Sequence, residues 1–275
     1  MRELRERNAL VTGAGGGLGG FIARALAAEG VNLALTDLPE APLDGLAAEL
    51  RSRGVRVEHV PADLADGEER RRLATWAGDA LGPVDVLVNN AGLEHGGSFL
   101  RSTETELEAI VAVNLLAVMG LTRILLAGML ERGRGHIVNV ASLAGKTPVP
   151  YLASYAATKH GVVGFTHSLR AEYGDEPVGF SAVCPAFVSR VGMYARLQEA
   201  VETGPNPVGT MPPERVGDAV VRAIRDNLAE VVVSKRRIKP MIALYAISPR
   251  AATRLARSRR ARDFGERFAK ARGRL

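Results

Sequence analysis

The stretch that decides the fold is Asn8-Ala9-Leu10-Val11-Thr12 followed by Gly13-Ala14-Gly15-Gly16-Gly17-Leu18-Gly19-Gly20. The first five residues are typical of a short strand, and residues 21–29 form a helical pattern that Gly30 ends. A strand, a glycine-rich turn and a helix in this order make a phosphate site, because the glycines let the backbone approach a pyrophosphate and the helix N-terminus offers unpaired N–H groups. Glycine runs also occur in flexible loops, but the position of this one favours dinucleotide binding. The predicted contacts are Gly13, Gly15, Gly16, Gly17, Leu18 and Gly19.

The second strand-like run, residues 31–36, ends at Asp37. An acidic residue about 20 positions beyond the glycine turn is where dinucleotide-binding folds grip a ribose 2′-hydroxyl. A carboxylate there repels the 2′-phosphate of NADP, and the glycine turn contains no Arg or Lys to attract it. The alternative is an ordinary surface Asp at a strand end. Given the turn upstream, we predict that Asp37 binds the ribose and that NAD is preferred over NADP.

Seven strand-like runs alternate with helical stretches along the 275 residues; they cover 8–12, 31–36, 55–60, 84–88, 136–140, 179–184 and 230–233. This alternation predicts an α/β fold, a Rossmann-type doubly wound seven-stranded parallel sheet with helices on both faces. A chain of this length can form one such domain. We assign residues 1–234 to the catalytic domain and residues 235–275 to a basic helical C-terminal extension.

Tyr155 and Lys159 are four residues apart in Ser154-Tyr155-Ala156-Ala157-Thr158-Lys159. If this stretch is helical, both side chains leave the same face one turn apart. An ammonium beside a phenol favours the phenolate, and a free tyrosine titrates near ~10, so acid–base work at neutral pH needs such help. The alternative is a Tyr and a Lys that decorate an ordinary helix. Because the same chain carries a dinucleotide-binding motif, we favour a catalytic role for Tyr155 and Lys159.

From about residue 8 to residue 233 the chain resembles the short-chain dehydrogenase/reductase family. The resemblance rests on five elements in the family's order: Thr12-Gly13 through Gly19, Asn89-Asn90-Ala91-Gly92, Asn114 within Val113-Asn114-Leu115, Ser142, and the pair Tyr155 and Lys159. Ser142 lies thirteen residues before Tyr155, the separation that this family uses.

The resemblance implies a catalytic tetrad. Tyr155 would be the general acid–base, while Lys159 would lower its pKa and bind the nicotinamide ribose. Ser142 would hold the reacting oxygen. Asn114 would distort its helix so that a water links the lysine to solvent, and the alternative is a buried Asn that serves only packing or a helix kink.

Further cofactor contacts follow from the same resemblance. Asp63 and its neighbour Leu64 would contact the adenine, although Asp63 could instead begin the next helix, a role that fits Asp66 better. Asn90 would lie against the adenosine half and Val188 would offer backbone groups to the carboxamide, with Ala91, Gly92 and Pro185 as further cofactor contacts. Ala186 stands where the family usually has Gly, and Ser189 or Arg190 stands where it has a Thr that touches the cofactor. Arg190 could alternatively reach a phosphate or an acidic substrate.

The charge of the chain is unevenly distributed. Residues 235–275 contain fourteen Lys or Arg and two acids, a balance of +12, so the first 234 residues carry −6 of the total of +6. Among the arginines of this extension, Leu255, Ala256, Phe264 and Phe268 suggest an apolar stripe. Three functions are considered for the extension. We rank packing on its own or a neighbouring subunit first and peripheral contact with anionic lipid second. Nucleic-acid binding comes last, because no recognition motif is present.

The substrate is predicted to be a hydrophobic small molecule with a secondary alcohol or ketone. Residues 191–211 match the family's variable lid, where Met193, Tyr194 and Leu197, with Phe187 and Leu143, suggest an apolar pocket, and Leu93, Glu94 and His95 are candidates for the opposite wall. Epimerase or dehydratase chemistry and a non-catalytic dinucleotide-binding regulator remain alternatives. The resemblance implies a homodimer or homotetramer. We expect no metal site, and the single Cys184 and the lack of a signal segment favour the cytoplasm, with membrane-peripheral contact as an option.

Overall fold

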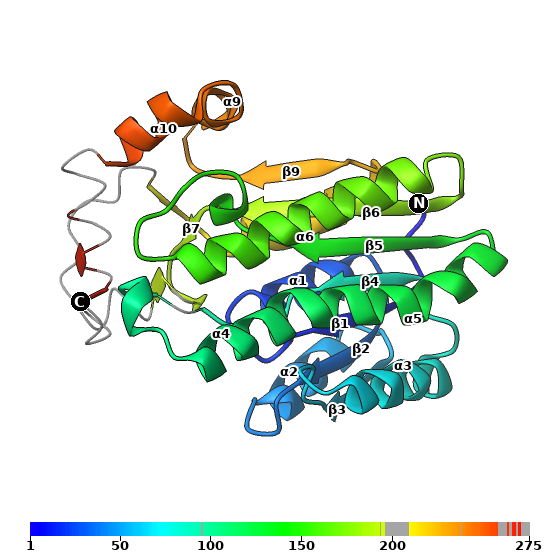
Figure 1. Ribbon diagram of the computed structural model, residues 1–275. Helices are drawn as coiled ribbons and strands as arrows, with labels where there is room; N and C mark the ends of the chain where they lie inside the picture. The colour runs from blue at the N-terminus through cyan, green and yellow to red at the C-terminus, as the bar shows by residue number, and fades with distance from the viewer. Residues whose placement is uncertain are drawn as a thin grey trace.

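The structure is a computed structural model that describes residues 1–94, 96–192, 194–195, 209–236 and 238–257, together with 263, 266–267 and 269–270. Its sheet contains seven parallel strands in the order β3-β2-β1-β4-β5-β6-β9 (Figure 1). These strands are β1 (Asn8–Thr12), β2 (Asn32–Asp37), β3 (Val57–Pro61), β4 (Val86–Asn89), β5 (Gly135–Val140), β6 (Val178–Pro185) and β9 (Glu230–Val233). A separate pair joins β7 (Phe187–Val188) to β8 (Thr210–Met211). The predicted fold is confirmed, and strand ends move by two residues at most.

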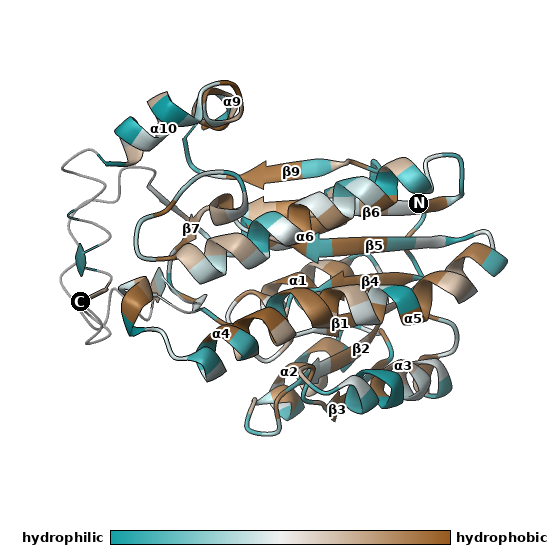
Figure 2. Cartoon of the chain, in the orientation of Figure 1, coloured by the Kyte–Doolittle hydropathy of each residue, from teal (hydrophilic) through white to brown (hydrophobic). Residues whose placement is uncertain are grey.

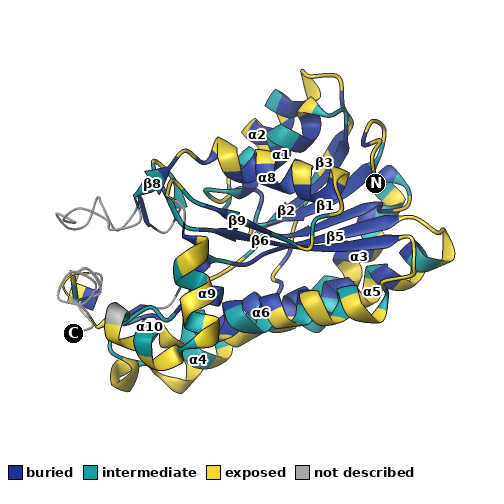
Figure 3. Cartoon of the chain, turned by 90° about the horizontal axis from the view of Figure 1, so that it is seen from above, coloured by how far each residue is buried: buried dark blue, intermediate teal, exposed yellow. Residues whose placement is uncertain are grey.

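Helices cover both faces of the sheet, as Figure 3 shows from above. One face carries α1 (Gly19–Ala28), α2 (Leu43–Arg51) and α8 (Glu214–Arg225), and the other carries α3 (Gly67–Leu81), α4 (Glu104–Val111), α5 (Ala117–Glu131) and α6 (Ala153–Glu172). Three short turns, η1 (Phe99–Arg101), η2 (Ala112–Leu116) and η3 (Leu143–Gly145), connect or interrupt these elements. Two further helices, α9 (Lys239–Ile247) and α10 (Pro249–Ala256), follow the last strand.

The central strands are apolar on both sides because helices cover both faces. All five residues of β1 and all four of β4 are buried, and the strands of the sheet are mostly dark blue in Figure 3. Leu33, Leu35 and Ile22 pack in the layer under α1, whereas Leu10, Leu87 and Ile137 pack toward α3 and α5. Burial of one such side chain stabilises the fold by roughly 1.5–3 kcal/mol. The two apolar layers therefore hold the sheet between its helices.

Local signals set several helix ends. The Asp66 carboxylate accepts a hydrogen bond from the Glu68 N–H and begins α3, as the sequence favoured. Thr103 and Glu106 form a reciprocal capping box at the start of α4. Gly30 takes a φ of +77° just after α1, a conformation that a side chain would disfavour.

The continuous helical run Glu104–Glu131 has the length and hydropathy to cross a membrane. Within the fold, however, Val118, Leu121 and Met129 of this run are buried against the sheet layers, and Asn114 interrupts it as a buried polar residue. We interpret the run as the covering helix of the sheet, which passes the same test of length and composition.

The strand order reverses at β1, whose neighbours are β2 on one side and β4 on the other. In open α/β sheets, ligands bind at the carboxyl ends of the strands beside such a reversal. The glycine turn follows β1 directly, and Asp37 ends β2. The fold therefore brings the sequence-predicted nucleotide contacts to one edge of the sheet.

Candidate active site

The glycine turn is closely packed against its surroundings. Gly13 has a φ of +65°, and a Cβ atom on it would lie 2.8 Å from the Cα of Ala91. Side chains at Gly17 and Gly19 would collide with the backbones of Gly192 and Gly13, respectively. Larger residues at these positions would push the turn away from the neighbouring loops, so glycine is required there by close approach as well as by dihedral angle.

Asp37 lies beside this turn. One oxygen of its carboxylate accepts hydrogen bonds from the N–H groups of Gly15 (2.9 Å) and Gly16 (3.1 Å). The other oxygen accepts from the N–H of Leu38 at 2.8 Å. Asp37 therefore connects the end of β2 to the turn after β1 and faces the cavity between them.

Thr12 and Asn90 fasten the ends of β1 and β4 together. The Asn90 amide donates to the carbonyl oxygens of Thr12 and Gly13, both at 3.0 Å. The Thr12 hydroxyl accepts from the N–H groups of Asn90 and Ala91, also at 3.0 Å. In this structure Asn90 thus positions the glycine turn, a role that the sequence alone did not suggest.

The N-terminus of α1 keeps donors available for an anion. Among the described residues, none accepts a hydrogen bond from the backbone N–H of Gly17 or Leu18. Both residues line a cavity of about 1120 Å³ at the carboxyl ends of the strands. Free N–H groups at a helix N-terminus suit a pyrophosphate. The cavity and these donors fit a dinucleotide.

The cavity unites most of the predicted site residues. Those that line it are Gly13, Gly16, Gly17, Leu18, Asp37, Asp63, Leu64, Asn90, Ala91, Gly92, Ser142, Tyr155, Lys159, Pro185 and Val188. Gly15, Gly19 and Asn114 do not line the cavity but lie next to residues that do. Asp63 accepts a hydrogen bond from the Ala65 N–H in the loop before α3, so helix capping by Asp66 leaves Asp63 on the cavity wall.

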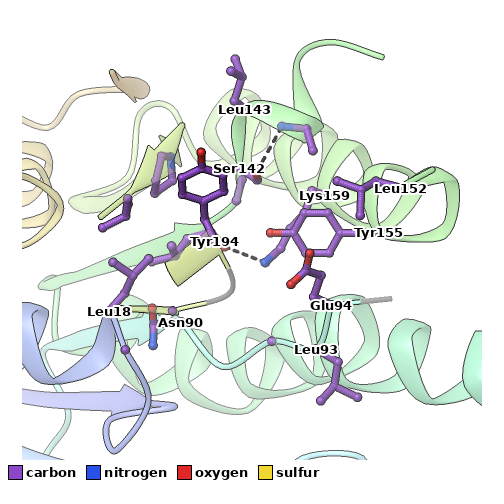
Figure 4. Close-up of a pocket in the computed structure, with 18 of the residues that line it drawn as sticks. Leu18, Asn90, Leu93, Glu94, Ser142, Leu143, Leu152, Tyr155, Lys159 and Tyr194 are labelled. Atoms are coloured by element: carbon purple, nitrogen blue, oxygen red, sulfur yellow. Dashed lines mark hydrogen bonds between the residues drawn. The ribbon is translucent and has the colours of Figure 1, made fainter. Parts of the chain in front are cut away.

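Tyr155, Ser142 and Lys159 converge in the same cavity (Figure 4). Tyr155 and Lys159 both project from α6, as their spacing predicted, and both are buried. The Ser142 hydroxyl accepts a hydrogen bond from the Ala144 N–H at 3.1 Å and lies near enough to Tyr155 to lower the pKa of its phenol. The Lys159 Nζ donates to the carbonyl oxygen of Val140 at 3.0 Å and lies 5.8 Å from the centre of the Tyr155 ring.

Burial dominates the electrostatics of this group. Burial raises the pKa of Tyr155, the neighbouring Ser142 hydroxyl lowers it by a smaller amount, and the negative charge of Glu94 raises it further. Burial also lowers the pKa of Lys159 to about 8. Burial disfavours the charged forms of both groups, and the Lys159 ammonium donates to the Val140 carbonyl. The lowering of the Tyr155 pKa by Lys159 stays a prediction for the protein with its cofactor bound.

Asn114 occupies a π-helical turn, η2, between α4 and α5, and it is fully buried. Its amide donates to the Leu93 carbonyl at 2.8 Å and to the Thr158 hydroxyl at 3.2 Å, and its oxygen accepts from the Leu93 N–H at 2.7 Å. A Cβ on Gly92 would lie 3.3 Å from the Asn114 oxygen and 3.5 Å from the Lys159 Nζ. Asn114 thus joins the loop after β4 to α6.

The end of β6 and the short strand β7 carry two of the predicted cofactor contacts. Pro185 and Val188 line the cavity, whereas the Ser189 hydroxyl donates to the Met211 carbonyl at 3.1 Å. Arg190 forms a double hydrogen bond to the Glu214 carboxylate at 2.6 and 2.8 Å on the exposed surface. The option that Arg190 reaches a phosphate or an acidic substrate is therefore not supported by this arrangement.

Comparison with known proteins settles the family. Residues 7–202 match the family described as short chain dehydrogenase. The chain belongs to the short-chain dehydrogenases. It is 37% identical over 274 residues to the ketoacyl reductase HetN of Nostoc sp. strain PCC 7120, covering 98% of this chain and 94% of that protein.

Two solved structures support the same conclusion. A variant of actinorhodin polyketide ketoreductase with NADPH has a TM-score of 0.77 and 34% identity, covering 83% of this chain and 95% of that one. A short-chain dehydrogenase/reductase from Burkholderia phymatum in complex with NAD has a TM-score of 0.80 and 29% identity, and the match covers 91% of this chain and 96% of that one. This short-chain dehydrogenase is therefore an oxidoreductase by family, with a nicotinamide dinucleotide as its cofactor.

Sequence reasoning missed one wall of the cavity in this short-chain dehydrogenase. Ile238, Met241 and Tyr245 line it from the C-terminal extension, and Ala256 of α10 joins them. Their spacing at i, i+3 and i+7 is that of one helix face and could have indicated a buried stripe. From the sequence we ranked packing of the extension on its own or a neighbouring subunit first, but we placed the apolar stripe at Leu255, Ala256, Phe264 and Phe268 and so overlooked this one.

Several other substrate-side predictions can be compared with the structure. Phe187, Tyr194, Leu143, Leu93 and Glu94 all line the cavity, and Glu94 points toward Tyr155 (Figure 4). His95, Met193, Leu197, Phe264 and Phe268 lie outside the described residues. Burial raises the pKa of the Cys184 thiol to about 12, which agrees with packing rather than nucleophilic chemistry.

Proposed function

We propose that this protein is an NAD-dependent oxidoreductase that interconverts a secondary alcohol and a ketone on a hydrophobic small molecule. The observation that carries the proposal is the convergence of Tyr155, Ser142 and Lys159 in the cavity that the glycine turn also lines. Two hydroxyl groups that face one cavity can hold a single carbonyl oxygen between them.

The chain's own groups account for the proton. In the reductive direction a bound nicotinamide supplies the hydride to the carbonyl carbon. The Tyr155 hydroxyl gives its proton to the substrate oxygen, and the Ser142 hydroxyl orients that oxygen. Because burial keeps Tyr155 protonated, its phenol is available as the proton donor in this direction. In the reverse direction the positive charge of an oxidised nicotinamide would add to that of Lys159 and stabilise the phenolate.

Asp37 supports NAD as the preferred cofactor. Its carboxylate is bound to the N–H groups of Gly15 and Gly16 at the site where a ribose would lie. The described residues that line the cavity include two cationic side chains, Lys159 in the catalytic group and Arg236 in the extension, and neither belongs to β2 or the glycine turn. A 2′-phosphate would therefore meet a fixed negative charge with no cation from these elements.

The cofactor experiment measures binding and turnover separately. We expect NADH to bind more tightly than NADPH to the native protein in calorimetric titrations. Asp37→Ser should reduce the ratio of NADH to NADPH affinity by about tenfold or more. The substitution removes both the repulsion of a 2′-phosphate and the carboxylate that would contact the ribose of NADH. Asp63→Asn, on the same wall but at the proposed adenine contact, is the matched control and should leave the preference unchanged. A native preference for NADPH would contradict the role given to Asp37.

The apolar cavity and the ketoacyl reductase relatives together support a ketone as substrate. A panel of alcohols, ketones and ketoacyl thioesters of increasing chain length, followed by nicotinamide absorbance, tests this. We expect turnover to improve with apolar length, with one nicotinamide consumed per product. Product formation without net consumption of nicotinamide would instead indicate the epimerase or dehydratase alternative. Dinucleotide binding with no turnover across the panel would favour a regulator.

We also propose that the protein forms a homodimer or homotetramer through the covering helices. Val111, Leu116 and Ile124 on α4, η2 and α5 are large apolar side chains that are 39%, 50% and 38% exposed. Such side chains on one helical run favour an association surface. Light scattering of the purified protein measures the state directly, and a monomer at micromolar concentration would contradict the proposal.

A further inference from the structure

Helix α9 is apolar on every side yet lacks a complete cover. Its sequence contains no charged residue after Lys239, and none of its residues is fully buried. Ile247 is 84% exposed and Leu244 is 38% exposed. A helix that is hydrophobic all round is normally buried, either in a protein core or in lipid. Within the described part of the chain, nothing covers the outer side of α9.

The inner side of α9 forms part of the catalytic cavity. Met241 and Tyr245 line that cavity, and the Tyr245 ring also meets His160 of α6 edge to face at 6.2 Å between ring centres. Helix α9 therefore stands between the cavity and the outer surface, next to the last strand β9 (Figure 1). Anything that binds its outer side lies one helix away from the substrate space.

Helix α10 adds a row of positive charge beside α9. Arg250, Arg254 and Arg257 follow the i, i+4, i+7 spacing of one helix face, and all three are exposed. Among the described residues, no acid lies within ion-pair distance of any of them. The sequence from 235 to 262 contains ten Lys or Arg and no Asp or Glu. Among the described residues of the extension, the apolar α9 is thus followed by α10, whose exposed arginines have no acidic partner; Figure 2 shows the change from brown to largely teal between the two helices.

We propose that α9 and α10 lie in the interface of an anionic membrane, so that the catalytic cavity opens toward the lipid and takes an apolar ketone from it. Acyl chains would cover Leu244 and Ile247, and anionic headgroups would neutralise the arginines of α10. A second copy of the chain fits less well, because pairing through this surface would bring two cationic rows together. The entry of substrate from lipid depends on the proposed function, whereas membrane binding does not.

Vesicle sedimentation tests the binding. The native protein should sediment with vesicles containing about 30% phosphatidylglycerol, bind neutral phosphatidylcholine vesicles at least about tenfold more weakly, and detach as salt is raised. Arg250→Glu/Arg254→Glu should weaken binding to the anionic vesicles by about tenfold or more. Arg71→Glu/Arg72→Glu on α3 is the matched control, because it changes the net charge equally on exposed arginines that are already paired with Glu68 and Glu69.

A fluorescent probe tests whether α9 enters the lipid. Trp76 on α3 is the single tryptophan of the chain, so Trp76→Phe/Ile247→Trp moves the only indole to the exposed end of α9. We expect its emission to shift to the blue with anionic vesicles and to be quenched by brominated acyl chains. The native protein, with its indole at Trp76, should show neither change.

Substrate entry is tested separately from the chemistry. Arg250→Glu/Arg254→Glu should reduce turnover of a vesicle-dissolved apolar ketone by about fivefold or more and leave turnover of a short, water-soluble ketone unchanged. Tyr155→Phe should bind vesicles as the native protein does, so failure of the catalytic assignment is distinguishable from failure of this one. Three results would each overturn the proposal. The first is equal binding of the native protein to neutral and anionic vesicles, and the second is a probe that brominated lipid does not quench. The third is a native protein that binds no vesicles, together with an arginine variant of changed oligomer size.

Discussion

The two ends of the cavity are built in different ways. At the nucleotide end, hydrogen bonds of backbone groups and short polar side chains form the wall. Asp37 accepts hydrogen bonds from the glycine turn, and Thr12 and Asn90 join that turn to β4. At the substrate end, the walls are apolar side chains such as Met241, Tyr245 and Leu152. Hydrogen bonds and close backbone approach fix residue identity narrowly, whereas apolar contacts mainly fix volume. Substitutions should therefore have sharply different consequences at the two ends.

The largest effect is expected where the two ends meet, at Tyr155. Tyr155→Phe removes the proton donor but keeps the ring, so turnover should fall by roughly 10²–10⁴-fold. NADH affinity should remain within about threefold. Stopped-flow kinetics and calorimetry measure the two quantities. Tyr173→Phe, at the end of α6 and packed on Phe180, is the control and should keep native turnover. Native turnover in Tyr155→Phe would remove this residue from the chemistry.

A methyl group at the nucleotide end should have the next largest effect. Gly17→Ala places a Cβ against the backbone of Gly192, which cannot yield as a flexible side chain would. Overpacking of about 1–3 kcal/mol corresponds to roughly a 5- to 150-fold loss of NADH affinity if the strain falls on the bound turn. Gly45→Ala on α2, where a Cβ meets nothing within 4 Å, should bind NADH normally. Equal affinities for both variants would show that the turn is looser than the structure indicates.

At the substrate end the expected loss is smaller and confined to substrate. Met241→Ser removes apolar surface from the cavity wall and should raise KM for a long apolar ketone by about tenfold, with kcat and NADH affinity nearly unchanged. Steady-state kinetics with ketones of two lengths distinguishes this from general damage, since a short ketone should be unaffected. An equal rise in KM for both lengths would place Met241 outside the substrate wall.

The smallest expected effect is a change in pH dependence. The negative charge of Glu94 raises the pKa of Tyr155, so Glu94→Gln should lower that pKa. Reduction requires protonated Tyr155, and its rate should therefore decline at a lower pH than in the native protein. Oxidation requires the phenolate and should begin at a lower pH. Profiles of kcat/KM in both directions measure the shift, and a shift toward higher pH would contradict the placement of Glu94.

The nucleotide end was largely predictable from sequence because its signals are local. The glycine turn, Asp37 and the spacing of Tyr155 from Lys159 each depend on a few neighbouring residues, and the seven strands follow from alternating apolar runs. The hydrogen bonds of Asn90 to the glycine turn and of Asn114 to Leu93 and Thr158 were not predictable, since they join segments far apart in the chain. The raised pKa of Tyr155 was missed because burial is a property of the whole fold.

The sequence by itself determined the family, the sheet and the identity of the polar groups at the nucleotide end, because glycine spacing and apolar periodicity act over short distances. Only the tertiary structure decided which side chains form the substrate wall. Helix α9 follows the edge strand β9 and lines the cavity with Met241 and Tyr245. An apolar residue does not indicate by its own chemistry which surface it will contact. Tertiary structure likewise decided that Lys159 bonds Val140 and that Arg190 pairs with Glu214, since charge alone does not specify a partner.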